Sequence, residues 1–513
     1  MSVAPSLPVL CVHSTAQQCF QFPEDPKNFH TLLTDGITGL KAIVSVNTLF
    51  GDESFAAPYL YRAALAITAL CVPAHPTPNA NFFDATAVPG HPAAIYARKK
   101  QAMHHYTRSI QALHATFPET TAAAFCNHPL QDIFVWFLTR LLLANYDLRL
   151  GHLAAWRAHL RAASRILSAF HARFMQRETG RQLAWAFARM ALLVELQDCD
   201  MAVTGTNIMN PGVASDLSSM VEQSERARDR LLVLIRRIGR IELKYRYRLQ
   251  EAPKWLAKLQ QVDCALSRWQ TSLPPSELPV DTGIQDSVSF AVRPNLAGKA
   301  QRVDIQPLTF PNAADTHAAA VSYAHFLCAR MRARTAYRPD GTKDPPRDTE
   351  ATVLHICRIA AGLSPEICAR SEAFGHGILP AIAGAYYWTT NSSMRNWIWQ
   401  WLGVYEIMGA REGIWNVQQT RRLMVFLDEE AARRRTAQST WEIVCARIDE
   451  NEDLVDEDNG VHECAIRREE RLMLEDVSSS ADGVLVARRC DPFTVTLHSN
   501  SACGWSTETL TVS

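Results

Sequence analysis

The sequence predicts an all-α protein: a large multi-helix bundle or irregular α-solenoid-like domain, followed by a disordered acidic C-terminal tail. Apolar residues recur every three or four positions through most of residues 31–448, which is the period of an amphipathic helix. Ile133–Leu148 is apolar on nearly every side, as expected for a helix in the middle of a helical body. The short apolar runs at 484–489 and 493–497 are too isolated to predict a sheet.

The chain is organised around Gln131–Phe170, which predicts a helical hairpin. Only four polar residues interrupt its first arm: Thr139, Arg140, Asn145 and Asp147. Gly151 follows Arg149, and a cation before a glycine is typical of a helix C-terminus. The second arm carries its apolar residues on one stripe, at Leu153, Trp156, Leu160, Ala163, Leu167 and Phe170. Both arms consist of packing residues, so the hairpin predicts architecture and no active site.

Three regions follow from composition: an irregular lead-in at 1–30, a helical domain at 31–448, and an acidic, Ser-rich tail at 449–513. The predicted helices are 31–50, 55–71, 93–116, the hairpin, 181–198, 222–249, 255–269, 316–337, 349–363, 373–390, 393–409, 414–435 and 437–448. Prolines, glycines and polar residues predict loops at 72–92, 203–219, 272–315 and 339–347.

Charge, apolar runs and cysteine content argue against nucleic-acid-binding, membrane-spanning and secreted classes of protein. Lys plus Arg and Asp plus Glu each number 52, so the basic excess that is typical of a stand-alone nucleic-acid-binding protein is missing. No apolar run approaches the roughly 20 residues of a membrane span. The N-terminus has no charged stretch of the kind that opens a secretory signal. Thirteen cysteines are scattered singly, which predicts reduced thiols in an intracellular protein.

Metal-site and hydrolase motifs are incomplete or missing in this sequence. Cys11, His13 and Cys19 lie close together, but no second pair of ligands follows at zinc spacing. His104 and His105 are adjacent, so on a helix they point about 100° apart and do not share one ion easily. The G-x-S-x-G, H-E-x-x-H and nucleotide-loop motifs do not occur. The sequence therefore predicts no catalytic, cofactor-binding, metal-binding or DNA-binding residue, and no cofactor.

Two charged segments have functional alternatives. The acidic residues Asp453, Asp456, Glu457 and Asp458 superficially resemble the metal-binding carboxylates of helical terpene cyclases. A solvated acidic tail is the simpler interpretation, and a segment that recruits transcription machinery is a third. The Arg-rich residues 226–248 could bind nucleic acid, but they are mixed with acids and fit an ordinary exposed helix face better. The short cluster Arg433–Arg435 is a weak signal for nuclear import.

Nine residues of the hairpin occur in an order that is also found in a known protein family. They are Leu141, Leu142, Tyr146, Gly151, Trp156, His159, Leu160, Ala162 and Ala163. This order resembles the signature of the fungal-specific transcription factor domain, the helical regulatory region of fungal Zn2Cys6 regulators. Other landmarks in the same order are Ala64–Leu70, Tyr106, Ile110, Leu113, Trp269, Leu273, Pro274, Pro275, Leu308, Phe310, Ala314, Tyr323, Pro380–Tyr387, Arg395, Trp397, Ile398, Leu402 and Gly409. The resemblance spans residues 35–440.

This sequence departs from the family because it has no six-cysteine cluster of the kind that binds two zinc ions and reads DNA. The resemblance therefore implies a nuclear transcription regulator or co-regulator without its own DNA reader, or a chain whose cluster is encoded upstream of Met1. It implies protein partners, among them a DNA-binding Zn2Cys6 regulator, a small-molecule effector, and control of metabolic or biosynthetic genes (secondary metabolism). The resemblance does not imply membrane association. The alternatives are a helical enzyme of the terpene-cyclase type with an unrecognised site, and a helical scaffold protein.

Overall fold

The computed structural model describes residues 57–71, 92–116, 128–197, 211–247, 252–281, most of 288–425, 443–449, 493–501 and 504–512. Within these ranges the body of the protein is 84% helical and contains 13 helices, which confirms the predicted all-α class. The predicted lead-in and the predicted helix at 31–50 lie outside the described residues, and so does most of the predicted loop at 72–92.

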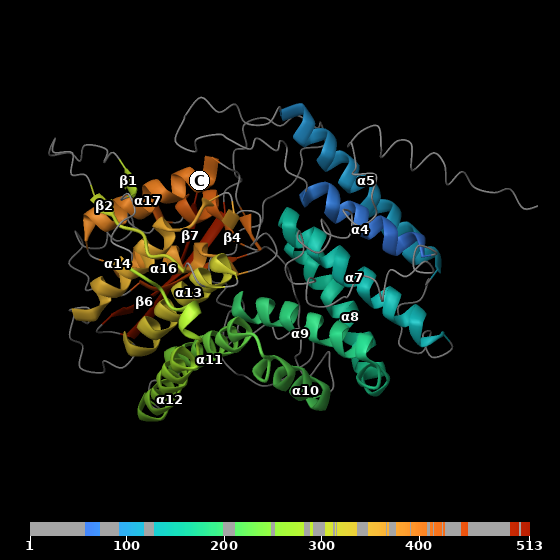
Figure 1. The fold of residues 1–513 in the computed structure, drawn as a ribbon, viewed down its shortest axis with the longest axis horizontal. Helices are drawn as coiled ribbons and strands as arrows, with labels where there is room; N and C mark the ends of the chain where they lie inside the picture. The colour runs from blue at the N-terminus through green and yellow to red at the C-terminus, as the bar shows by residue number, and fades with distance from the viewer. Residues whose placement is uncertain are drawn as a thin grey trace, which may run out of the picture.

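Four helices form one end of the molecule (Figure 1). They are α4 (Pro58–Cys71), α5 (Pro92–Thr116), α7 (Leu130–Leu150) and α8 (Leu153–Met175). Helix α4 packs along α5 and also against α7, while α7 packs along α8. Both predicted arms of the hairpin are confirmed, and the second arm continues five residues beyond Phe170.

Helix α7 is buried along its whole middle, as its apolar composition predicts. Each residue from Ile133 to Leu148 is buried. The helix ends at Gly151, whose φ of 84° is left-handed and therefore favours glycine. The N–H of Gly151 donates to the carbonyl oxygen of Leu148, and the N–H of His152 donates to that of Asp147. These two bonds satisfy terminal carbonyls and turn the chain into α8.

The next three helices are α9 (Glu178–Gln197), α10 (Pro211–Glu222) and α11 (Ala227–Tyr247). The predicted loop at 203–219 is wrong where α10 occupies it. Proline is favoured in the first turn of a helix, so Pro211 starts α10 rather than breaking it. Val213, Leu217 and Val221 then recur every four residues and are buried. The serines between these residues make the apolar pattern too weak to predict a helix from the sequence.

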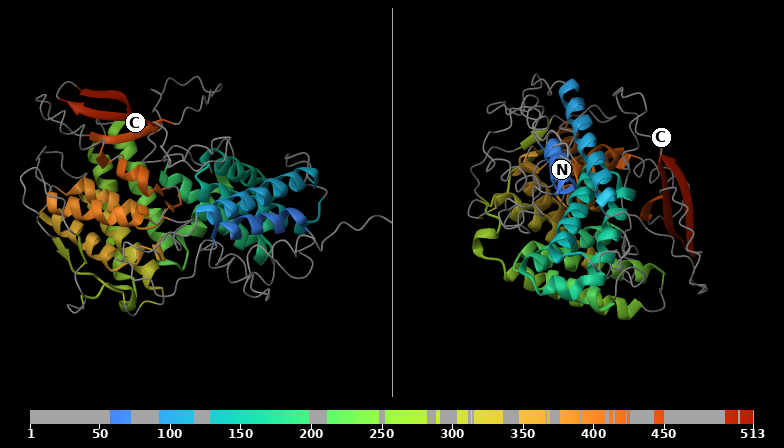
Figure 2. Two further views of the ribbon diagram at one scale, coloured as in Figure 1. Left: turned by 90° about the horizontal axis from the view of Figure 1, so that it is seen from above. Right: turned by 90° about the vertical axis from the view of Figure 1, so that its right-hand side faces the viewer.

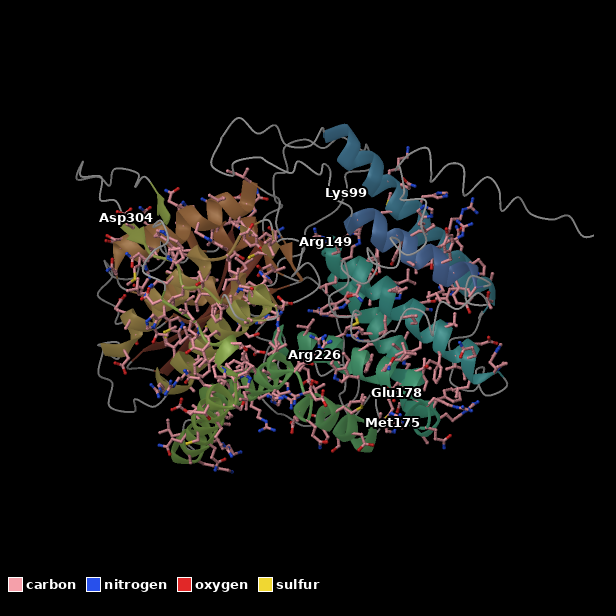
Figure 3. The ribbon with its side chains drawn as sticks, viewed as in Figure 1. Lys99, Arg149, Met175, Glu178, Arg226 and Asp304 are labelled. Carbon is pink, nitrogen blue, oxygen red and sulfur yellow. The ribbon has the colours of Figure 1, made fainter. Side chains whose placement is uncertain are left out.

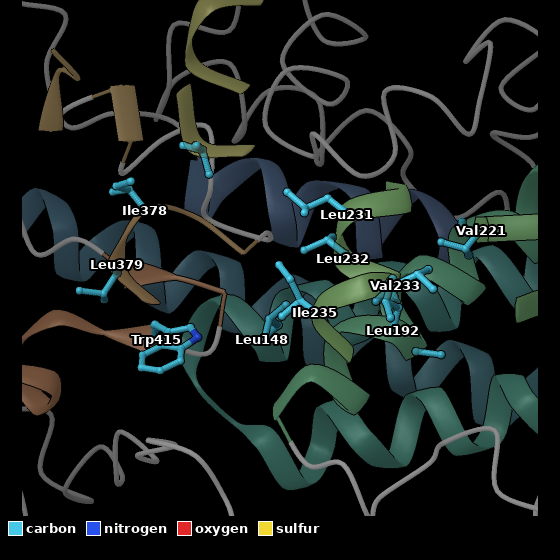
Figure 4. Packing of buried hydrophobic residues seen from close by; sticks show 14 of the residues in the cluster. Leu148, Leu192, Val221, Leu231, Leu232, Val233, Ile235, Ile378, Leu379 and Trp415 are labelled. Carbon is cyan, nitrogen blue, oxygen red and sulfur yellow. The ribbon is translucent and has the colours of Figure 1, made fainter. Parts of the chain in front are cut away.

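Helix α11 connects the two ends of the molecule. It packs against α9 and α10 on one side and against α12 (Ala252–Thr271) and α13 (Thr316–Thr335) on the other (Figure 1). Figure 4 shows Leu231, Leu232 and Ile235 of α11 between side chains of the N-terminal helices and those near Ile378. The buried apolar residues of both ends therefore belong to one core.

The C-terminal end of the body contains three further helices: α14 (Arg347–Ala361), α16 (Leu379–Trp388) and α17 (Ser392–Ile407). Helix α14 packs against α13 and α16. The predicted loop at 272–315 holds a 3-10 turn, η3 (Pro275–Glu277), and two short strands, β1 (Val288–Phe290) and β2 (Val303–Ile305). These strands pair antiparallel.

Two short strands correct the start of the predicted helix at 414–435, and residues 426–435 lie outside the described residues. Strands β3 (Arg411–Glu412) and β4 (Trp415–Asn416) form a tight antiparallel pair around Gly413, which has a φ of 54°. Helical residues begin only at Val417. The side chain of Asn416 accepts hydrogen bonds from the N–H groups of Gln418 and Gln419, which caps this helix start.

A three-stranded antiparallel sheet at the C-terminal end corrects two predictions. Strand β5 (Ile443–Asp449) occupies the second half of the predicted helix at 437–448, whose first half lies outside the described residues. Strands β6 (Phe493–Ser501) and β7 (Gly504–Val512) lie within the predicted disordered tail. The sheet lies to one side of the helical body (Figure 2). Strand β6 begins by alternating threonine with apolar residues, which suits a pleated surface, and it pairs with β7 along the chain. Its pairing with β5 is long-range and not visible in local sequence.

Candidate functional site

A buried polar cluster lies where α5, α7 and α8 meet, inside an otherwise apolar bundle. Its members are Tyr106, Arg140, Asp147 and His159, with the exposed His152 at its edge, and they are called the Asp147 cluster below. Arg140 and Asp147 are two helical turns apart on α7, so their side chains lie on the same face. Tyr106 on α5 and His159 on α8 reach this face from the neighbouring helices.

The carboxylate of Asp147 is the centre of the cluster, and its side chain is 1% exposed. The Tyr106 hydroxyl donates a hydrogen bond of 2.9 Å to Oδ2. Nε2 of His159 lies 3.3 Å from the same oxygen, and Nδ1 of His152 lies 3.4 Å from Oδ1. A buried carboxylate is costly unless it is paired and hydrogen-bonded, and here groups from two helices and a connecting turn surround it.

The donors in the cluster determine where its protons lie. Nη1 of Arg140 is 3.2 Å from Nδ1 of His159. Because a guanidinium only donates, Nδ1 accepts and the ring proton is on Nε2, which faces Asp147. Burial lowers the pKa of Arg140 to about 10, so this side chain is still a cation at neutral pH. His159 therefore lies between a buried cation and a buried anion.

Tyr106 is held in the cluster as a neutral phenol. Burial, together with the neighbouring Asp147 carboxylate, raises the pKa of Tyr106 far above its ordinary value. Its ring stacks on that of Tyr146, with the two centroids 4.4 Å apart. At neutral pH Tyr106 therefore donates a proton to a hydrogen bond and does not act as a base. With Asp147 also enclosed, the geometry is typical of a network that holds three helices together.

The sequence contained a signal for this cluster, namely the four polar interruptions of α7. Two of them satisfy themselves within their own helix, because Thr139 donates to the Val135 carbonyl oxygen and Asn145 donates to that of Leu141. The other two, Arg140 and Asp147, carry charges that a buried helix does not satisfy alone. Buried charges predict partners, but nothing in the sequence identifies Tyr106 or His159 as those partners.

A second buried carboxylate, Glu412, lies in the C-terminal half. The Tyr405 hydroxyl donates to its Oε1 at 2.6 Å, and the N–H of Leu379, at the start of α16, donates to its Oε2 at 2.6 Å. A helix N-terminus favours a negative charge, so this position stabilises the anion. Gly377 leaves room for it, because an added Cβ would lie 2.3 Å from the carboxyl carbon. Sequence reasoning did not identify this site.

Three arginines of α11 pair with carboxylates of neighbouring helices. Arg236 and Arg240 place guanidinium nitrogens 3.0 and 2.8 Å from Oε2 of Glu195 on α9. Arg237 lies 2.9 Å from Glu222 on α10. These arginines connect neighbouring helices. The pairing favours a structural role for the 226–248 segment over nucleic-acid binding.

The start of α11 is held in a similar way. Arg189 on α9 donates to Asp229 at 2.8 Å. The guanidinium groups of Arg189 and Arg226 lie 5.0 and 5.1 Å from the ring centroid of Trp185. Arg228 donates to the carbonyl oxygen of His376 in the C-terminal half at 2.8 Å. These contacts link α9, α11 and the chain before α16.

The remaining predictions about sites have mixed outcomes. His104 is exposed and His105 is buried, so the two rings lie on different faces of α5 as predicted. In the described part of the chain, no group of three His, Cys, Asp or Glu side chains is arranged to hold a metal ion. Cys11, His13 and Cys19 lie outside the described residues, and so do the acidic residues 453–458 and Arg433–Arg435.

None of the described helices combines the length and apolarity that crossing a membrane requires. Comparisons of the chain with protein-family models, with curated proteins and with solved structures give no match.

Proposed function

We propose that this protein is a nuclear transcription regulator or co-regulator that acts through contacts with other proteins and not through catalysis. The observation that carries the proposal is the hairpin of α7 and α8. Tyr146, Trp156 and His159, which have family counterparts in the fungal-specific transcription factor domain, are all buried in its packing. Their burial supports a scaffold in which these residues preserve a fold.

The engagement of buried carboxylates supports a binding role over an enzymatic one. Asp147 and Glu412 are each hydrogen-bonded by the protein's own groups, including a tyrosine hydroxyl in both cases. A catalytic carboxylate must reach the reacting atoms of a substrate. Both of these side chains instead hold helices in place.

The paired arginines of α11 support the part of the proposal that concerns DNA. Phosphate contacts by Lys and Arg dominate the affinity of proteins for DNA. Here Arg236, Arg237 and Arg240 meet carboxylates of the neighbouring helices. We therefore assign sequence reading to a DNA-binding partner, such as a Zn2Cys6 regulator, with metabolic or biosynthetic genes as targets.

A tethering assay tests this function. The whole chain would be fused to a foreign DNA-binding domain and brought to a reporter promoter in a fungal cell. We expect transcription to change severalfold relative to the foreign domain alone, and only on reporters that carry its binding site. Unchanged transcription by a fusion that is folded, nuclear and bound to the promoter would refute the proposal.

A matched variant makes the assay sharper. Asp147→Ala removes the centre of the Asp147 cluster, whereas Asp132→Ala removes an exposed carboxylate from the same helix. If the folded hairpin is needed for the regulatory effect, Asp147→Ala lowers the effect and Asp132→Ala leaves it unchanged. Protein levels would be matched by immunoblotting.

A further inference from the structure

Charge is distributed unevenly along this electrically balanced chain. Helices α4, α5 and α8 contain no aspartate and no glutamate. Their nine basic residues are Arg62, Arg98, Lys99, Lys100, Arg108, Arg157, Arg161, Arg165 and Arg173. Helix α7, packed against them, contributes two carboxylates, of which Asp147 is enclosed and Asp132 is at the opposite end of α7. The N-terminal helical unit is therefore strongly basic.

Part of this charge forms an exposed row along α5. Lys100, His104 and Arg108 are each four residues apart, so they lie on one face of the helix, and all three are exposed. Met103 lies beside them and is 55% exposed, which is unusual for a large apolar side chain in this protein. We call these four residues the α5 row. Figure 3 labels Lys99 on the same helix.

The α5 row differs from the arginines of α11 in its pairing. Among the described residues, neither Lys100 nor Arg108 forms an ion pair, whereas Arg236, Arg237 and Arg240 do. The positive charge near the row also affects a neighbour. Burial, with smaller contributions from His104 and Arg62, lowers the pKa of His105 to about 4. The row thus adds charge where nothing in the described protein neutralises it.

We propose that the α5 row docks an acidic segment of a partner protein, one that carries Asp or Glu together with apolar side chains. The carboxylates would pair with Lys100 and Arg108, and an apolar side chain would pack on Met103. This inference goes beyond the proposed function, because the α5 row can bind an acidic segment whether or not the protein regulates transcription. The two tests are therefore independent of each other.

The dimensions of the row favour an acidic peptide over nucleic acid. From Lys100 to Arg108 the row is about 12 Å long at 1.5 Å per residue. The affinity of a DNA-binding protein grows with the number of phosphates that its Lys and Arg side chains neutralise, and the row has two permanent charges. An exposed methionine also gains little against a phosphate backbone, but it adapts well to apolar side chains of varied shape. Each of these points matches a short acidic and apolar segment.

Fluorescence anisotropy with the full-length chain tests the proposal. The probe is a labelled 15-residue peptide that alternates Asp or Glu with Leu or Phe, and the second probe has Asn and Gln in place of the acids. We expect the acidic peptide to bind and the neutral peptide to bind at least about tenfold more weakly. Failure of the acidic peptide to bind at low ionic strength overturns the proposal.

Charge-reversal variants locate the surface. Lys100→Glu with Arg108→Glu should weaken binding at least about tenfold, and Met103→Ser should weaken it severalfold. The control is Lys254→Glu with Lys258→Glu, which makes the same change in net charge at two exposed positions of α12. Equal loss in the control would overturn the proposal, because net charge alone would then explain binding.

A third arm distinguishes nucleic acid from peptide. A 20-base-pair DNA duplex would be titrated under the same salt conditions. Binding of the duplex that is tighter than that of the acidic peptide, and lost on reversal of Lys100 and Arg108, overturns the proposal in favour of a nucleic-acid surface. Circular dichroism would confirm that each variant keeps the helical content of the natural chain.

Discussion

The buried charged residues of this protein differ in the groups that compensate their charge. Asp147 and Glu412 are buried carboxylates whose partners come from other helices or from the start of one. Arg140 is a buried cation that meets its counter-charge through His159. Because an unpaired buried charge is very costly, each of these residues requires its partner to be in place.

The Asp147→Ala variant should lower the free energy of unfolding by about 3–5 kcal/mol, because it leaves Arg140 as an uncompensated buried cation. Urea denaturation followed by circular dichroism measures the change. The control is Asp132→Ala, an exposed carboxylate in the first turn of the same helix, with an expected loss of at most about 1 kcal/mol. Similar losses in the two variants would contradict the role given to the cluster.

His105 should make stability fall in mild acid. Its pKa is lowered to about 4 in the folded protein, chiefly by burial, while an unfolded histidine titrates near pH 6.5. The unfolded chain therefore binds more protons between these values, so the free energy of unfolding decreases as pH falls from 6.5 to 4.

His105→Gln should remove about 1–2 kcal/mol of this acid sensitivity, a figure reduced for solvent screening. The measurement is urea denaturation at pH 7 and at pH 4.5. His114→Gln, at an exposed position on the same helix, should leave the pH dependence unchanged. An equal effect at both positions would show that burial is not the cause.

At the scale of elements, local chemistry explains most starts and ends. The left-handed Gly151 ends α7, and Pro211 begins α10. Where predicted elements were wrong, the local pattern was mixed. The helix stripe of α10 is diluted by serine, and strand β6 begins by alternating threonine with apolar residues.

Substitution of two glycines should have opposite effects on stability. Gly151→Ala should cost about 1–2 kcal/mol, because alanine is strained at a φ of 84°. Gly403 lies inside α17, where an added Cβ would make ordinary contacts of 3.7 Å with the Arg421 guanidinium. Gly403→Ala should therefore raise stability by about 0.5–1 kcal/mol. Thermal denaturation of both variants tests the sign, and a loss at both positions would contradict it.

At the scale of the whole molecule, α11 makes one body out of two groups of helices. Its apolar residues join the core that both groups share, and its arginines pair with acids on α9 and α10. Since neither group has a separate core, unfolding should be cooperative across the described helices.

Leu231→Ala should lower the free energy of unfolding by about 2–5 kcal/mol, because Leu231 is fully buried in α11. Circular dichroism and tryptophan fluorescence should report one shared transition in this variant as in the natural chain. Two separate transitions would show that the groups of helices fold independently and that α11 does not unite them.

The sequence by itself determined the all-α class and the central hairpin, because helical periodicity and the buried arm Ile133–Leu148 are local properties. It also marked Arg140 and Asp147 as charges in an apolar helix. Only the tertiary structure decided their partners, since Tyr106 and Asp147 are 41 residues apart. The tertiary structure also places the N–H of Leu379 against the carboxylate of Glu412 and pairs β5 with β6. Such pairings depend on how helices and strands pack against each other, and local sequence patterns do not predict that packing.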